Sequence, residues 1–244
     1  MYKVMSPYKL LYLTAALSMP VGLTACGNLA QIADTGAQVS QAMGYNPSQL
    51  AGGVKEVLSL SSTRAADALG MAGGYSNSEQ YRIKLPPAVQ DIADSLRRFG
   101  LGGYIDSVEQ LMNDGAEKAA GEAKNLLIAA VKDMSVDDAI GIVRGGDNAA
   151  TRYFRSQTEA QLRAKYQPIM QSQLKQLGFY GDYQQLLNAY KLVSLPNKPS
   201  LDLEEHAIQL GMDALFEQVA REEQKIRANP MEQGSALISS VLSR

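Results

Sequence analysis

The sequence predicts an all-α protein, an irregular bundle of about seven or eight helices with a short extended arm near residues 79–85. Along most of the chain after residue 50, apolar residues recur at spacings of three and four, which is the period of an amphipathic helix. Glycine and proline separate these stretches, and no repeated alternation of apolar and polar residues indicates a sheet. Hydrophobic residues make up 45% of the 244 residues, enough to bury a core, so wholesale disorder is excluded.

The N-terminus has the features of a bacterial lipoprotein signal peptide. Lys3 and Lys9 give it a basic start, and residues 10–23 are almost all apolar. That run is too short to cross a hydrocarbon core of ~30 Å as a helix, but it suits a signal peptide. It ends in LTAC at residues 23–26, which resembles the lipobox that precedes the acylated cysteine of lipoproteins. The alternatives are an ordinary signal peptide or a buried N-terminal helix with an incidental cysteine.

Cleavage before Cys26 would make this cysteine the first residue and the site of lipid attachment. We expect a signal peptide over 1–25, a lipidated tether over 26–49 and a single helical domain over 50–244. Two or three acyl chains such as palmitate hold a domain on a membrane essentially permanently. Because Gly27 follows the cysteine, where an aspartate commonly retains lipoproteins in the inner membrane, we expect the outer membrane, with the domain facing the periplasm.

The first half of the domain combines helices with the extended arm. Apolar spacing predicts a helix from about residue 50 to Leu69, stopped by Gly70 and the following glycine pair. Over 79–85, apolar and basic residues alternate before two prolines, and no partner strand follows, so we expect an extended arm packed on helices. The two prolines open a helix that ends at Gly100.

The apolar spacing then predicts separate helices that begin near Ile105 and Leu127. A capping-box pattern starts a short helix over 135–143.

The second half of the domain is predicted to contain longer helices. Asp147 is placed to cap a helix that runs to Leu177, with Pro168 as a kink or break. Gly178 ends this helix. The remaining prediction comprises a short helix over 183–192, a loop over 195–200, a helix over 203–229 stopped by Pro230, and a weak helix over 235–242.

Several short stretches resemble an uncharacterised bacterial family, domain of unknown function 4197 (DUF4197). They are LPP at 85–87, LRRFGLG at 96–102, MN at 112–113, AEKAA at 116–120, MSVDDA at 134–139, GGDNAATRYFR at 145–155, ALF at 214–216 and EEQKIR at 222–227. The resemblance covers roughly residues 50–242. It implies a secreted or lipid-anchored helical protein and brings no established activity.

Composition excludes several kinds of chemistry. With 23 basic and 25 acidic residues the net charge is −2, which argues against a nucleic-acid partner. A single histidine and a single cysteine exclude multi-histidine sites and zinc clusters. His206, beside two glutamates, is expected on a solvated helix surface, and the chain lacks the GxSxG and phosphate-loop patterns. We therefore expect no metal site and no cofactor.

A set of polar residues in the central and C-terminal stretches forms a candidate cluster if their helices pack together: Glu117, Asp147, Thr151, Arg152, Arg155, Glu222, Glu223 and Arg227. Structural ion pairs are the favoured interpretation, and a polar pocket for acid–base chemistry is the alternative. Tyr153 and Phe154 are candidate ligand contacts, although aromatic residues at helical spacing more often belong to the core.

These observations favour a membrane-anchored, non-enzymatic binding or structural module in the envelope, with an envelope protein or a hydrophobic ligand as partner. One alternative is a carrier of a lipid or another hydrophobic small molecule, which would need an apolar cavity. A second alternative is a hydrolase that uses paired carboxylates.

Overall fold

The computed structural model describes residues 47–98, 100, 102–135, 142, 146–192, 201–233 and 235–242. Within these ranges the protein is all-α, as predicted, with eight α-helices, one 3-10 turn and no strand. None of the described helices is both long and apolar enough to span a membrane. The expected signal peptide, Cys26, most of the tether, most of the 135–143 helix and the 195–200 loop lie outside the described residues.

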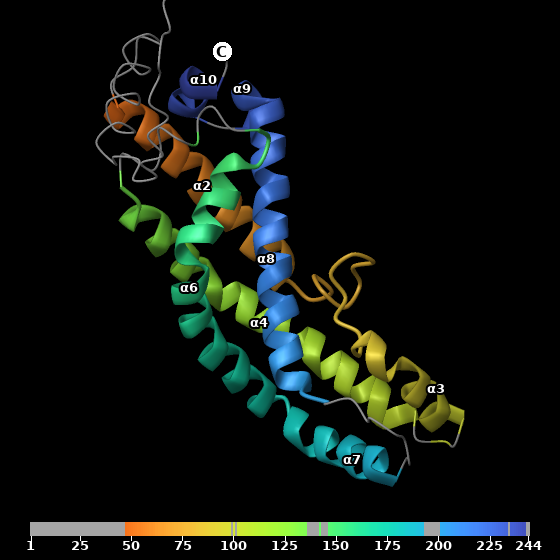
Figure 1. The fold of residues 1–244 in the computed structure, drawn as a ribbon. Helices are drawn as coiled ribbons and strands as arrows, with labels where there is room; N and C mark the ends of the chain where they lie inside the picture. The colour runs from red at the N-terminus through yellow and green to blue at the C-terminus, as the bar shows by residue number, and fades with distance from the viewer. Residues whose placement is uncertain are drawn as a thin grey trace, which may run out of the picture.

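Four long helices form the body of the molecule, and α4 lies at its centre, where it contacts α2, α3, α6, α7 and α8 (Figure 1). α3 and α7 lie at one end, on either side of α4, while α9 and α10 lie at the other end near α2. In chain order the described elements are α2 (Pro47–Gly70), the 3-10 turn η1 (Pro87–Val89), α3 (Gln90–Arg98), α4 (Gly102–Asp133), α6 (Ala149–Gln176), α7 (Phe179–Leu192), α8 (Leu203–Ala228), α9 (Pro230–Gln233) and α10 (Ala236–Leu242).

α4 is one continuous helix of 32 residues, so the prediction of two separate helices beginning near Ile105 and Leu127 was wrong. The middle of α4 lacks large apolar residues at helical spacing, which is why the pattern indicated a gap. Its inward face is instead made of Gly115, several alanines and two polar residues, Asn113 and Glu117, all of which are buried. Small side chains let neighbouring helices approach this stretch closely.

One such approach brings the backbone at the end of α2 against the backbone of α4. A Cβ atom added to Gly70 would lie 2.9 Å from both the Cα and the backbone N of Gly121. A Cβ added to Gly121 would meet nothing within 4 Å outside its own helix. The close contact therefore requires glycine at position 70, whereas position 121 has room for a Cβ atom.

This asymmetry gives a prediction. Gly70→Ala is expected to lower the free energy of unfolding by about 1–3 kcal/mol, because two backbones must move apart. Gly121→Ala is expected to raise it by up to about 1 kcal/mol, because alanine loses less backbone entropy within a helix. Urea denaturation followed by circular dichroism measures both values, and equal effects of the two substitutions would contradict this account of the crossing.

The second half of the bundle differs from expectation in three places. α6 continues through Pro168 without the break that was one of the two predicted outcomes, and the carbonyl that this proline leaves without its helical N–H partner belongs to the exposed residue Ala164. The N-cap of α6 is Asn148 rather than Asp147, and no side-chain cap bond is made by it. α7 begins at Phe179, earlier than predicted. Gly178, with a φ of 83°, separates α6 from α7 as the sequence indicates.

Two tyrosines are fully buried where α4, α6 and α8 meet the chain after α2. The Tyr75 hydroxyl donates a hydrogen bond of 2.7 Å to the carbonyl oxygen of Gly211 on α8. A Cβ at Gly211 would lie 2.6 Å from the hydroxyl oxygen of Tyr166, so this glycine makes room for a tyrosine of α6. Burial raises the pKa of both phenols well above its ordinary value.

Tyr75 and Tyr166, together with Tyr180 on α7, lead us to predict that the protein loses stability at alkaline pH. Burial, together with a hydrogen bond of 2.7 Å to Glu204 and the charge of that carboxylate, raises the pKa of Tyr180 to about 12. A tyrosine in the unfolded chain titrates near pH 10. The stability that Tyr75, Tyr166 and Tyr180 contribute is therefore complete below about pH 10 and is lost as the pH rises through their folded pKa values.

The chain has 12 tyrosines and no tryptophan, so tyrosinate absorbance follows this titration directly. We expect the urea midpoint to fall above about pH 10 and part of the absorbance change to coincide with unfolding. Tyr180→Phe should reduce the pH dependence. Titration of all the tyrosines near pH 10 in a chain that stays folded would contradict the prediction.

Candidate functional site

A row of three polar side chains on α4, Glu109, Asn113 and Glu117, holds the segment of chain between α2 and η1. These residues are four positions apart, so they project from one face of the helix. All three are buried, with exposed fractions of 8%, 1% and 7%. Buried polar groups need hydrogen-bond partners, and the segment of residues 71–86 supplies them. We refer to these three residues as the α4 polar row.

Asn113, in the middle of the row, and Glu109, at one end of it, form hydrogen bonds with the backbone of the extended arm. Asn113 Oδ1 accepts from the backbone N–H of Ile83 at 2.9 Å, and its Nδ2 donates to the carbonyl of the same residue at 2.8 Å. Glu109 Oε1 accepts from the N–H of Leu85 at 2.9 Å. The side chains of α4 thus form the hydrogen bonds with the arm's backbone N–H and C=O groups that a neighbouring strand would form in a sheet. This agrees with the predicted arm that packs on helices without a partner strand.

Glu117, at the other end of the row, holds the turn that follows α2. Glu117 Oε1 accepts hydrogen bonds from the backbone N–H groups of Tyr75, at 3.1 Å, and Ser76, at 3.0 Å. The Ser76 hydroxyl donates to the same oxygen at 2.9 Å. The carboxylate of Glu117 therefore orders a loop, which supports a structural role rather than a catalytic one.

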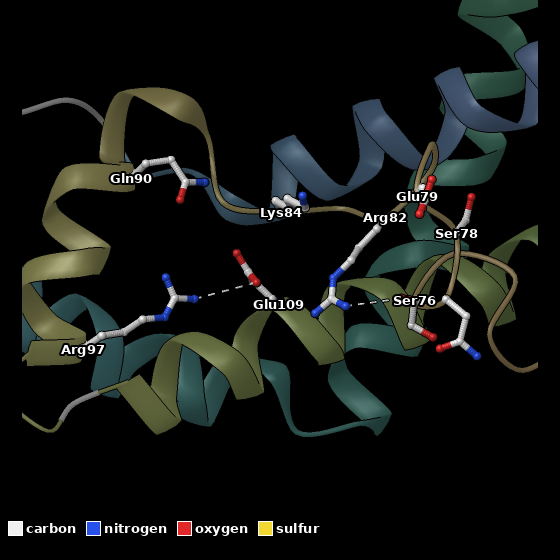
Figure 2. Close-up of a pocket in the computed structure, with 9 residues that line it drawn as sticks. Ser76, Ser78, Glu79, Arg82, Lys84, Gln90, Arg97 and Glu109 are labelled. Carbon is white, nitrogen blue, oxygen red and sulfur yellow. Dashed lines mark hydrogen bonds and ion pairs between the residues drawn. The ribbon is translucent and has the colours of Figure 1, made fainter.

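Between the 71–86 segment, α3 and α4 lies an open polar groove with a volume of about 610 Å³. This volume lies within the ~300–1,000 Å³ range of ligand pockets. Figure 2 shows Glu109 rising from α4 between Arg97 on one side and Arg82 on the other, below the stretch that carries Lys84. The groove is lined by Ser76, Asn77, Ser78, Glu79, Arg82, Lys84, Gln90, Arg97 and Glu109.

The Glu109 carboxylate is only partly used by the protein. Its Oε2 atom forms a long ion pair of 4.0 Å with Arg97 Nη2, which is beyond hydrogen-bond distance (Figure 2). Arg97 bonds instead to Asp106 at 3.0 Å and to Asp94 at 3.3 Å, and the hydrogen bond to Asp106 raises the pKa of the guanidinium. Glu109 Oε2 therefore keeps an open acceptor position on the floor of the groove.

Two cations on the rim lack acidic partners within the described ranges. Arg82 donates one weak hydrogen bond of 3.4 Å to the carbonyl of Ser76. The ammonium of Lys84 forms no ion pair with any described carboxylate. Both side chains are exposed. They are therefore free to bind an anionic group of a ligand without first breaking a pair.

The predicted polar cluster is divided among several places, and one group of its members does meet. Glu223 on α8 is fully buried at the start of α6, where its Oε2 accepts from the backbone N–H of Thr151 at 2.7 Å and from its hydroxyl at 2.6 Å. Glu223 Oε1 accepts from the N–H of Ala150 at 3.1 Å and from Arg227 Nε at 2.7 Å. This carboxylate, rather than Asp147, caps α6.

The other members of the predicted cluster lie apart. Glu222 pairs with Lys225 at 2.6 Å and lies 4.0 Å from Arg64. Arg155 forms ion pairs with Glu159 and Asp213, away from Glu117. The side chains of Asp147 and Arg152 are exposed. These contacts are structural ion pairs and caps, and they do not converge on one pocket.

The two candidate aromatic contacts belong to the protein interior. Phe154 is fully buried and packs edge to face on Phe216, with ring centroids 6.1 Å apart, while Tyr153 is partly buried against the same core. The nearby apolar cavity, lined in part by Leu162, Tyr166 and Phe216, has a volume of about 10 Å³. That is room for about one water molecule at most and far less than a lipid needs.

The single histidine is less exposed than the expected solvated surface position. His206 is half-buried on α8, and its Nε2 lies 2.8 Å from the carbonyl oxygen of Lys84. In the part of the chain that the structure describes, no group of three or more histidine, cysteine, aspartate or glutamate side chains is placed to hold a metal ion.

The groove itself was missed by reasoning from sequence. Two signals were present: basic residues alternating with buried ones at Arg82 and Lys84, and polar residues at every fourth position of α4. Each has a common explanation, a solvated edge or a helix surface, and only their packing against each other creates a groove.

The comparisons with known proteins bear on the family alone. The family model described as "Protein of unknown function (DUF4197)" matches residues 44–243. No curated protein and no solved structure matches the chain.

Proposed function

The chain belongs to the DUF4197 family, and we propose that it is a lipid-anchored, non-enzymatic binding module of the bacterial envelope. The observation that carries this proposal is the polar groove, in which two cations have no acidic partner among the described residues and one carboxylate oxygen has only a guanidinium 4.0 Å away. A surface that is ordered by a buried row of hydrogen bonds, yet keeps unpaired charges, is suited to binding a polar ligand.

The proposed location rests on the N-terminal sequence. A basic start, an apolar run and a lipobox-like tetrapeptide ending at Cys26 occur in the order that lipoproteins require. Because Gly27 follows the cysteine, the proposed site is the outer membrane, with the domain facing the periplasm.

Binding is favoured over the two alternatives by the surroundings of particular residues. The carboxylates of Glu117 and Glu223 accept hydrogen bonds from backbone N–H groups, so they stabilise the fold and are poorly placed for acid–base work. The apolar cavity beside Phe216 is too small for an acyl chain.

The anchor is tested by labelling growing cells with a palmitate analogue. The wild-type chain should become labelled and sediment with outer membranes, while Cys26→Ser should remain unlabelled. An unlabelled wild-type chain would overturn the proposed location.

The groove is tested by site-specific photo-cross-linking in the envelope. A photoreactive residue replaces Glu79 in the groove or, as a control, Lys191, which is exposed on α7. We expect a discrete cross-linked product from position 79 that is absent at 191 and weakened by Arg82→Glu. Equal products at both positions, or none at position 79, would overturn the role of the groove.

A further inference from the structure

We infer that the polar groove binds a short peptide, and that it recognises the free carboxylate and the free ammonium group of that peptide. The inference rests on the proposed function, since it names the ligand of the same groove. Three features of the groove carry it: an unpaired cationic rim, an open carboxylate oxygen on the floor, and hydroxyl and amide groups between them.

The rim selects an anion. Arg82 and Lys84 both reach the groove from the extended arm, and neither is neutralised by an acidic side chain within the described ranges. A guanidinium binds a carboxylate through two parallel N–H bonds, and a nearby ammonium adds a second charge. Because Arg97, the third cation of the lining, is already paired with Asp106 and Asp94, the positive charge open to a ligand lies on Arg82 and Lys84.

The floor selects a cation or an N–H donor. Glu109 is more than nine-tenths buried, and one of its oxygens is fixed by the N–H of Leu85. The other oxygen, Oε2, points into the groove with Arg97 no closer than 4.0 Å (Figure 2). A ligand ammonium at this position would complete the hydrogen bonding of a carboxylate that the protein leaves half satisfied.

The remaining lining suits peptide groups. Ser76, Asn77, Ser78 and Gln90 line it with hydroxyl and amide groups. The Ser76 hydroxyl already donates to Glu117 and the Gln90 amide to the carbonyl of Leu85, which leaves their oxygens able to accept from a ligand. No apolar residue among those described lines the groove, so the acyl chains of a phospholipid would find no hydrophobic side chain to pack against there. A zwitterionic lipid headgroup carries the same two charges, but it lacks the amide groups that these side chains match.

The test is isothermal titration calorimetry on the mature, lipidated chain in detergent micelles. The probes are free trialanine and the free wall stem tetrapeptide L-Ala-γ-D-Glu-meso-diaminopimelyl-D-Ala. We expect saturable binding of at least one peptide, weakened when its amino group is acetylated or its terminal carboxylate is amidated. Failure of both peptides to bind would overturn the inference.

Charge-reversal variants link the binding to the groove. Arg82→Glu and Lys84→Glu alter exposed side chains, so the fold is retained, and each is expected to weaken peptide binding by about tenfold or more. Lys191→Glu on α7 is the matched control and should bind as the wild type does. Binding that survives both groove substitutions would overturn the inference.

A soluble lipid headgroup, glycerophosphoethanolamine, provides the competing outcome. If it binds as tightly as either peptide, the peptide class is wrong. Because the cross-linking at position 79 needs no assumption about the ligand, a groove that cross-links but binds neither peptide would reject this inference and leave the proposed function standing.

Discussion

A Glu223→Gln substitution is expected to lower the free energy of unfolding by about 3–5 kcal/mol, the cost of breaking a buried, hydrogen-bonded charge pair from one side. Glu223 has no exposed surface, and its two oxygens accept four hydrogen bonds from Ala150, Thr151 and Arg227. Its negative charge lies at the N-terminus of α6, where the helix dipole stabilises an anion. The loss should therefore appear as a large fall in the urea midpoint.

Glutamine cannot rescue this site. Its amide keeps one accepting oxygen, but the other oxygen becomes a nitrogen that carries hydrogens. In one orientation this nitrogen faces the two donors of Thr151, and in the other it faces the donors of Ala150 and Arg227. The control is Glu232→Gln on α9, where the side chain is exposed and the change should stay within about 0.5 kcal/mol. Equal urea midpoints for the two variants would show that the cap contributes little to stability.

Helix positions could be predicted from sequence where one apolar face met the core. The apolar spacing located α2 and α8 to within a few residues, and the glycines predicted to end helices do so. Gly100 and Gly178 have φ values of 80° and 83°, which other residues rarely adopt. In these places the local sequence alone determines the structure.

α4 shows where apolar periodicity fails. Asn113 and Glu117 are buried among apolar residues of the core, but a polar side chain counts against a core face in any periodicity rule. Their partners are backbone groups of the 71–86 segment, which lies about 30 to 40 positions away in sequence for these two residues. Nothing near α4 in the sequence signals that pairing.

The candidate cluster shows the same limit for a site. The sequence identified Thr151, Glu223 and Arg227, and the structure brings these three together at the start of α6. Arg155 and Glu222 came from the same stretches of sequence, but they face other neighbours because the rotation of each helix decides which side chains meet. Residue types near helix ends could be predicted, whereas convergence between helices depends on packing.

The second large effect is expected at Asn113, where alanine should lower the free energy of unfolding by about 2–4 kcal/mol, because buried groups lose their partners. Asn113 is 1% exposed, and its removal leaves both the N–H and the carbonyl of Ile83 unpaired beside α4. Urea denaturation measures the loss. Amide hydrogen exchange at Ile83 and Leu85 should become faster, since the extended arm is held by the α4 polar row.

An Asn113→Asp variant separates hydrogen bonding from packing. Aspartate has nearly the same shape, but its second oxygen would replace the amide that donates to the carbonyls of Ile83 and Glu109. We therefore expect it to destabilise the protein about as much as alanine does, while Gln110→Ala on the exposed side of α4 changes little. A stable Asn113→Asp protein with slow exchange at Ile83 would mean that packing, and not this hydrogen-bonded row, holds the wall of the groove.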